Sequence, residues 1–178
     1  GRSRRALLRL ALLLHDIAKP ATVSRDAKGH VHFFEHEHLG AKSAIQVLRK
    51  RLRCSEDEVS VVSHLIRLHL RPGHLAASAS VSDKAAWRLV RDAGPDFLSL
   101  VLHADADRLA THHHRGVSGS AHRRTIRQML RVRQAALVRK PAVRLVTGND
   151  LMKELGLKPG PIVGELLRAV DEAVALGA

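Results

Sequence analysis

A histidine and an aspartate stand side by side at the end of an apolar run, His15 and Asp16 in LLHDIAKP. Burying an acid and a base without compensation costs on the order of several kcal/mol. The pair is therefore expected either at a helix end in contact with water or facing a shared partner such as a metal ion. A metal ion held by imidazole and carboxylate groups lowers the pKa of a bound water and polarises a phosphoryl oxygen. The chemistry to consider is metal-assisted hydrolysis.

Further metal ligands would have to come from inward faces of other helices. His69 lies on an apolar helical face, and Asp105 interrupts the leucine stripe of residues 98–109. His36 stands one turn before Gly40, whose missing side chain would let another helix approach closely. Taken singly, each has a plainer interpretation: a hydrogen-bonded core histidine, an aspartate paired with an arginine, or a surface histidine near a helix start.

The other histidines in question are interpreted as exposed or structural, namely His30, His32, His38 and His64. The run 112–114 contains three consecutive histidines, which would point in different directions on a helix. A solvated basic run is therefore the better interpretation of that segment than a metal tract.

Helical periodicity recurs almost everywhere. Capping boxes at Ser55/Glu58 and Thr147/Asp150, and a cap at Ser82, mark helix starts. Loops are expected at 19–35, with a short extended piece at 31–34, and at 71–82, after a helix that stops at Arg71-Pro72. Helices are expected at 4–17, from about 37 to 52, 55–71, 82–94, from Pro95 to about 111, 121–138, and in two short segments after Pro141 separated by residues 157–160.

Composition supports packed helices. Of the 178 residues 45% are apolar but only 2% aromatic, and strands favour aromatic and β-branched side chains. The single cysteine, Cys54, excludes an internal disulfide and suits a reducing cytoplasm. No apolar run approaches the roughly 20 residues that span a bilayer. We expect an all-α, non-membrane protein, with a compact helical domain over residues 1–115 and a basic helical extension over 116–178.

The formal net charge of +13 points to a polyanionic partner, RNA or DNA. Arg123, Arg127 and Arg131 form one stripe of the helix expected at 121–138. The plainer alternative is a solvated basic face. Because aromatic residues are few, arginine contacts to the phosphate backbone are the expected binding mode.

Several motifs together indicate a family. LLHDIAKP, HFFEHEHLGAKSA, IRLHLRP and LVLHADADRLAT resemble the HD phosphohydrolase superfamily, and more narrowly the HD domain that follows the nucleotidyltransferase head in bacterial CCA-adding enzymes and poly(A) polymerase-like proteins. The C-terminal TGNDLMKELGLKPGPIVGELLRAV is similar to the C-terminal segment of those enzymes. The resemblance covers nearly the whole chain and implies an all-α HD bundle with a divalent metal held between helices.

The resemblance also implies roles for individual residues. The implied metal ligands are His15, Asp16, His36, His69 and Asp105, with Asp107 as a rival for the last place. The implied catalytic residues are His15, Asp16 and Lys19, the lysine lying near a substrate phosphate. Mg²⁺, Mn²⁺, Ni²⁺, Fe²⁺ and Zn²⁺ all suit such mixed nitrogen and oxygen ligands. Two departures are Ala18, where the family has glycine, and the lack of a histidine upstream of the doublet.

Two principal functions follow. One is metal-dependent hydrolysis of phosphomonoesters or 2′,3′-cyclic phosphodiesters of nucleotides or RNA ends, combined with tRNA binding. The other is a non-catalytic tRNA-binding body of a CCA-adding enzyme. Hydrolysis of free signalling nucleotides is a third, weaker option, because the C-terminal segment points to tRNA. The Gly-Ser motif and paired aspartates of a nucleotidyltransferase are absent from the sequence. We therefore expect either a nucleotidyltransferase domain upstream in a larger protein or a truncated relative of these enzymes.

Overall fold

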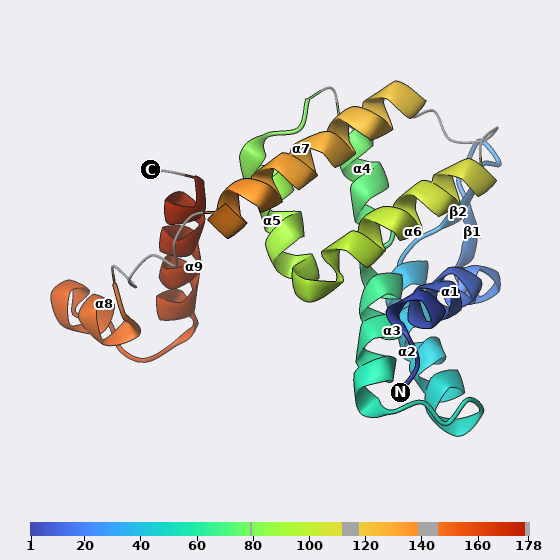
Figure 1. The fold of residues 1–178 in the computed structure, drawn as a ribbon, viewed down its shortest axis with the longest axis horizontal. Helices are drawn as coiled ribbons and strands as arrows, with labels where there is room; N and C mark the ends of the chain where they lie inside the picture. Colours follow the sequence, from blue (N-terminus) through green and yellow to red (C-terminus); the bar gives the residue numbers. More distant parts are fainter. Residues whose placement is uncertain (79, 112–117, 139–145, 177–178) are drawn as a thin grey trace.

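A computed structural model describes residues 1–78, 80–111, 118–138 and 146–176 of the chain. Figure 1 shows helices throughout, with one small hairpin. The elements are α1 (Arg4–Leu14), the 3₁₀ helix η1 (Lys19–Ala21), β1 (Val23–Arg25), β2 (Val31–Phe33), α2 (His36–Lys50), α3 (Glu56–Leu68), α4 (Arg71–Ala77), α5 (Asp83–Ala93), the 3₁₀ helix η2 (Gly94–Asp96), α6 (Phe97–Ala110), α7 (Gly119–Val138), α8 (Gly148–Leu155) and α9 (Pro161–Leu176). The expected all-α class is confirmed.

The hairpin accounts for the one extended piece predicted from the sequence. Strand β2 covers all but the last residue of the predicted segment 31–34. Strand β1, which was not predicted, pairs with it antiparallel, with Val23 opposite Phe33. The Asp26 side chain accepts hydrogen bonds from the backbone N–H groups of Lys28 and His30, which closes the turn. In the described part of the chain this hairpin is the whole of the sheet structure.

Helix boundaries follow the capping residues. The boxes at Ser55 and Thr147 are both formed, each with its side chain accepting from the N3 backbone N–H. The first helix ends at Leu14, one turn earlier than predicted. The predicted loop after Arg71-Pro72 is wrong, because these residues begin α4. Proline is tolerated in a first helical turn, where its missing N–H needs no intrahelical partner.

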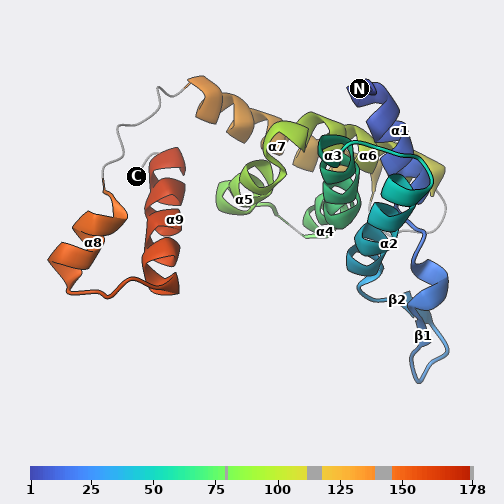
Figure 2. The same ribbon diagram turned by 90° about the horizontal axis from the view of Figure 1, so that it is seen from below.

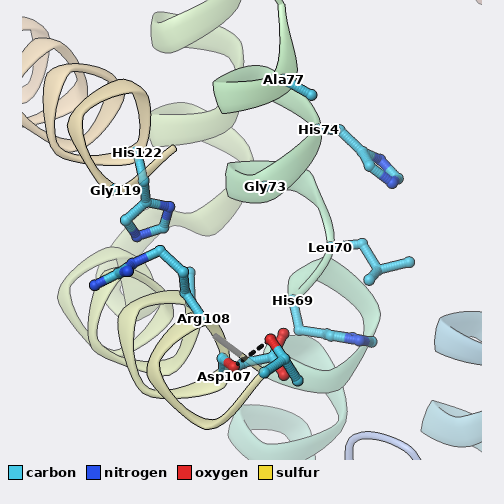
Figure 3. A pocket seen from close by; sticks show the side chains of 11 residues that line it. His69, Leu70, Gly73, His74, Ala77, Asp107, Arg108, Gly119 and His122 are labelled. Carbon is cyan, nitrogen blue, oxygen red and sulfur yellow. Dashed lines mark hydrogen bonds between the residues drawn. The ribbon is translucent and has the colours of Figure 1, made fainter. Parts of the chain in front are cut away.

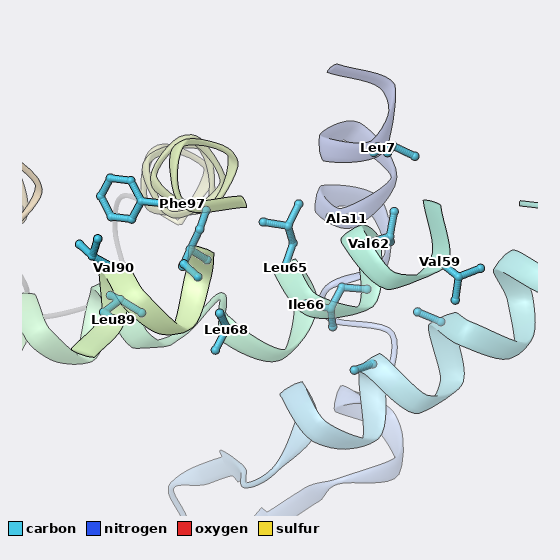
Figure 4. Packing of buried hydrophobic residues seen from close by; sticks show 14 of the residues in the cluster. Leu7, Ala11, Val59, Val62, Leu65, Ile66, Leu68, Leu89, Val90 and Phe97 are labelled. Atoms are coloured by element: carbon cyan, nitrogen blue, oxygen red, sulfur yellow. The ribbon is translucent and has the colours of Figure 1, made fainter. Parts of the chain in front are cut away.

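The core runs along α3, which packs against α1, α2, α5 and α6 (Figure 4). The largest fully buried side chains include Leu65 and Ile66 of α3, Leu89 of α5 and Phe97 of α6. Helix α7 adds Met129 to the same buried cluster and thus packs onto this body. The division between residues 1–115 and 116–178 stays a prediction, and the structure shows α7 sharing the core of the preceding helices.

Helices α8 and α9 stand at the end of the molecule away from α1, α2 and α3, as both views show (Figures 1 and 2). Glu172 of α9 forms ion pairs with Lys84 and Arg88 of α5, at 3.2 and 3.1 Å. Among the described residues, no helix combines the length and apolarity needed to cross a bilayer.

Candidate functional site

Three predicted ligands stand at helix ends and share one hydrogen-bond pattern. His15 directly follows α1, His36 begins α2, and His69 directly follows α3. The Nδ1 atom of each ring lies 2.8, 2.6 and 2.6 Å, respectively, from the carbonyl oxygen of the residue three positions earlier. Because a carbonyl oxygen only accepts, Nδ1 carries a proton in all three rings. This pattern turns Nε2, the other ring nitrogen and a common metal ligand, toward the neighbouring side chains.

The three Nε2 atoms face one carboxylate. Asp16 places Oδ2 3.1 Å from Nε2 of His15, and Oδ1 3.4 Å from Nε2 of His36 and 4.0 Å from Nε2 of His69. His15, Asp16 and His69 can each offer one ligand atom, all within 4.8 Å of one another. The structure thus brings together four of the five residues expected as metal ligands, and their role as ligands stays a prediction. We call His15, Asp16, His36 and His69 the histidine cluster.

The unsatisfied atoms of the histidine cluster fit a divalent cation. Within the described residues, Nε2 of all three histidines and Oδ1 of Asp16 are buried and have no hydrogen-bond partner. Buried polar atoms are normally paired, and leaving one unpaired costs roughly 1–3 kcal/mol. These four atoms have the nitrogen and oxygen chemistry that a divalent cation accepts, and those of His15, Asp16 and His69 lie close enough together to share one ion.

The pKa values of the His15 and His69 rings are shifted in opposite directions. Burial lowers the pKa of His69 to about 4, so this ring is neutral at neutral pH. Burial also disfavours charge on His15, but the carboxylates of Asp107 and Asp16 outweigh it and raise the pKa of His15 to about 10. Burial raises the pKa of Asp16, whereas the nearby His15 ring and the ammonium group of Lys19 lower it well below its usual value. A metal ion at Nε2 of His15 would take the place of the proton held there.

Close helix packing and a lysine complete the surroundings of the cluster. A Cβ atom at Gly40 would lie 3.4 Å from the carbonyl oxygen of His15, so the predicted close approach at this glycine is confirmed. Lys19 places Nζ 2.6 Å from Oδ2 of Asp16. A role for Lys19 beside a substrate phosphate stays a prediction, since in this structure its partner is the aspartate.

The prediction that Asp105 faces the interior is wrong. Its stripe on α6 is the solvent face, where Leu98, Leu102 and Leu109 are about half exposed. Asp105 instead lies beside Arg108, 3.3 Å away, and His122. The rival residue Asp107 is the one that reaches the cluster, with Oδ1 3.6 Å from Nε2 of His15.

Sequence reasoning missed His103. This residue is fully buried on α6, and its ring centroid lies 5.2 Å from that of His15 and 5.7 Å from that of His69. Burial lowers the pKa of His103 to about 4. The spacing was a usable signal, because His103 and Asp107 are four residues apart and so share a helical face.

The remaining histidines behave largely as predicted. His30 and His32 lie on the hairpin, both within about 3 Å of Asp26 Oδ2. His38 is exposed, and Nδ1 of His64 pairs with Asp96 at 3.1 Å. The histidine run 112–114 lies outside the described residues.

The predicted arginine stripe is exposed on α7. Arg123, Arg127 and Arg131 point away from the face that carries His122 and Met129, which are buried against the body. At 1.5 Å of rise per residue, the three arginines cover about 12 Å of helix. The stripe is thus free to meet a ligand along α7.

Comparison with known proteins gives one family and two curated relatives. A family model described as tRNA nucleotidyltransferase domain 2 matches residues 37–178. The A-adding tRNA nucleotidyltransferase of Deinococcus radiodurans is 40% identical over 178 residues, covering 96% of this chain and 38% of that protein. The CC-adding tRNA nucleotidyltransferase of Thermus thermophilus is 35% identical over 170 residues, covering 95% of this chain and 36% of that protein. The chain thus spans little more than a third of the length of these relatives.

Proposed function

Because the chain belongs to the tRNA nucleotidyltransferase domain 2 family, we propose that it is the tRNA-binding body of a nucleotide-adding enzyme. The exposed arginine stripe on α7 is the observation that carries this proposal. Its regular spacing suits a phosphate backbone, and double-stranded RNA is recognised mainly through shape and backbone contacts. The scarcity of aromatic residues argues against base stacking as the main contact. A nucleotidyltransferase domain upstream belongs to the same proposal, since the chain covers only 38% and 36% of these two nucleotidyltransferases.

Direct binding measurements test this proposal. We expect the chain to bind a full tRNA more tightly than a single-stranded RNA of equal length and charge, because a folded duplex presents fixed phosphate positions to a rigid helix. Electrophoretic shifts at several salt concentrations should give a linear fall of log K with log salt. Equal affinity for both RNAs would leave only non-specific charge attraction, and an absence of binding would overturn the proposal.

A second candidate function is the hydrolysis of phosphate esters, and the histidine cluster favours it. His15, His36 and His69 with Asp16 would hold a divalent metal, whose chemistry here would be activation of water and polarisation of a phosphoryl oxygen. Asp16 also holds Lys19, which would present its ammonium group to a phosphate at the mouth of the cluster. Membership of the HD superfamily, suggested by the same residues, belongs to this candidate function.

Release of inorganic phosphate tests the second candidate. The first substrate is a nucleoside 2′-monophosphate, whose hydrolysis releases phosphate. The second is a 2′,3′-cyclic nucleotide, whose ring-opened product is measured by chromatography. Each is tested with Mg²⁺, Mn²⁺, Ni²⁺, Fe²⁺ or Zn²⁺. Asp16→Asn removes the charge while keeping the shape, so turnover should fall by about 100-fold or more, since even residues that only orient metal ligands are worth roughly 10–100-fold. Asp92→Asn, an exposed carboxylate on α5, is the matched control. If wild-type protein shows no turnover with any of these metals, the second candidate is wrong.

A further inference from the structure

A cavity of about 200 Å³ lies beside the histidine cluster, between α4, α6 and α7 (Figure 3). His69 and Asp107 line the end next to the cluster. Arg108, Gly119 and His122 line the other end. The cavity therefore connects the candidate metal ligands to the beginning of α7, which carries the arginine stripe.

The far end of the cavity is positively charged. Gly119 is the first residue of α7, and a Cβ atom built there would lie 3.6 Å from Nη1 of Arg108 and 3.4 Å from Nη1 of Arg123. Two guanidinium groups thus meet at the N-terminus of a 20-residue helix, where the helix dipole favours anions. Asp105 is the carboxylate paired with Arg108, at 3.3 Å, and it offsets only part of this charge.

His122 supplies an independent sign of a ligand. The residue is only 3% exposed, and within the described residues its Nε2 atom has no hydrogen-bond partner. The nearest charged oxygen, Oδ1 of Asp105, lies 3.6 Å away, too far for a hydrogen bond. Burial and the charge of Arg108 lower the pKa of His122, against the opposing effect of the Asp105 carboxylate. An acceptor entering the cavity would satisfy both the ring nitrogen and the arginines.

The size of the cavity limits its ligand. Pockets for drug-sized molecules are about 300–1,000 Å³. At about 200 Å³ this cavity has room for a phosphate and part of a sugar, and a base would remain outside it.

We propose that this cavity binds the terminal phosphate of a nucleotide or of an RNA end, held by Arg108, His122 and the N-terminus of α7. A phosphate held there would face His69 and Asp107 at the edge of the histidine cluster. The proposal rests on the second candidate function for what happens to the phosphate, but binding itself can be measured without any turnover.

Gly73 allows the cavity to be filled without touching the candidate ligands. It lines the cavity from α4, one turn from Ala77, and a Cβ atom there would meet no atom within 4 Å. Gly73→Leu should therefore occupy the space, whereas Gly73→Ala leaves most of it open. Arg108→Gln removes the charge and leaves a shorter polar side chain. Arg91→Gln is its control, since Arg91 also pairs with an aspartate but lies on α5 outside the cavity.

The test is calorimetric binding of orthophosphate to the full chain in chelator, with no metal present. Wild type, Gly73→Ala and Arg91→Gln should bind alike. Arg108→Gln should weaken binding about tenfold or more, the usual effect of losing a charged hydrogen bond. Gly73→Leu should abolish it. Thermal melts identify any variant that fails to fold, and NMR of labelled histidines adds a readout on wild type alone, with His122 shifting and His30 unchanged. No binding by wild type, or equal binding by Gly73→Leu, overturns the proposal.

The source of the phosphate is distinguished by two further probes. One is adenosine monophosphate, and the other is a short RNA with a 3′-phosphate. The affinity of this RNA is compared with that of the same RNA carrying a 3′-hydroxyl, because both make the same contacts along α7. A preference for the 3′-phosphate end that Gly73→Leu removes assigns the cavity to RNA ends. Tight binding of the mononucleotide without that preference assigns it to free nucleotides. If Gly73→Leu affects neither probe, the proposal is wrong even where phosphate release is observed.

Discussion

Addition of a divalent transition metal should raise the melting temperature of the wild-type chain, and Asp16→Asn should remove that rise. A ligand at 100 times its Kd stabilises the folded state by about 2.7 kcal/mol, which for a chain of this size corresponds to roughly 5–11 °C. The physical reason is that Asp16 Oδ1 and three imidazole Nε2 atoms are buried without hydrogen bonds among the described residues. A metal ion would pair all four at once, and the asparagine amide would leave a neutral, weaker ligand in their midst.

Differential scanning fluorimetry with Co²⁺, Mn²⁺ and Ni²⁺ measures this, each variant being compared with its own metal-free melt. Asp92→Asn is the matched control, because this aspartate is held by Arg71 and Arg91 on the surface, away from the cluster. His69→Ala should behave like Asp16→Asn, because it removes another candidate ligand atom, the Nε2 atom of a fully buried ring. An equal rise in wild type and Asp16→Asn would mean that the metal binds elsewhere, and the histidine cluster would then be only a buried polar network.

Replacing Arg123, Arg127 and Arg131 together by glutamine should weaken tRNA binding by about 100-fold at low salt. Each phosphate contact contributes about −0.7 to −0.9 to the slope of log K against log salt. Loss of three contacts should therefore flatten the slope by about 2–3. The three side chains are exposed on α7, so the folded body should keep its stability.

The control for this prediction is a second triple variant with the same loss of charge. It combines the substitutions Lys50→Gln, Arg51→Gln and Arg53→Gln. These residues lie at the end of α2 and in the turn before α3, and Figure 1 shows this turn at the other end of the body from α7. Their tRNA affinity should change far less at moderate salt, where charges more than about 10 Å from the RNA are screened. Equal losses for both triples would mean that net charge, and not the stripe on α7, governs binding.

The sequence was sufficient for much of the fold because its local signals agree with one another. Capping boxes at Ser55 and Thr147 mark helix starts that the structure confirms. Gly40 predicted the close approach of another segment to its helix, and it lies against the backbone of His15. Helical spacing placed His69 on an inward face, and the family resemblance named it together with His15, Asp16 and His36.

Helix α6 shows why the rest was not predictable in the same way. It is apolar on two faces, one with Phe97 and Leu100 and the other with Leu98 and Leu102. Periodicity alone cannot choose between two apolar stripes, so the outer stripe with Asp105 was taken for the inner one. The inner stripe carries His103 and Asp107. The cavity beside it depends on how α4, α6 and α7 pack together, which no local pattern encodes.

The placement of Asp107 also bears on how the molecule folds. Its partner His15 follows α1, and helices α2 to α5 lie between the two residues along the chain. Closing so long a loop has an entropic cost that must be met before the contact forms. Contacts between residues far apart in the chain slow folding. We expect the cluster to assemble once α6 has packed against α1, and an ion bound there would oppose the separation of these helices.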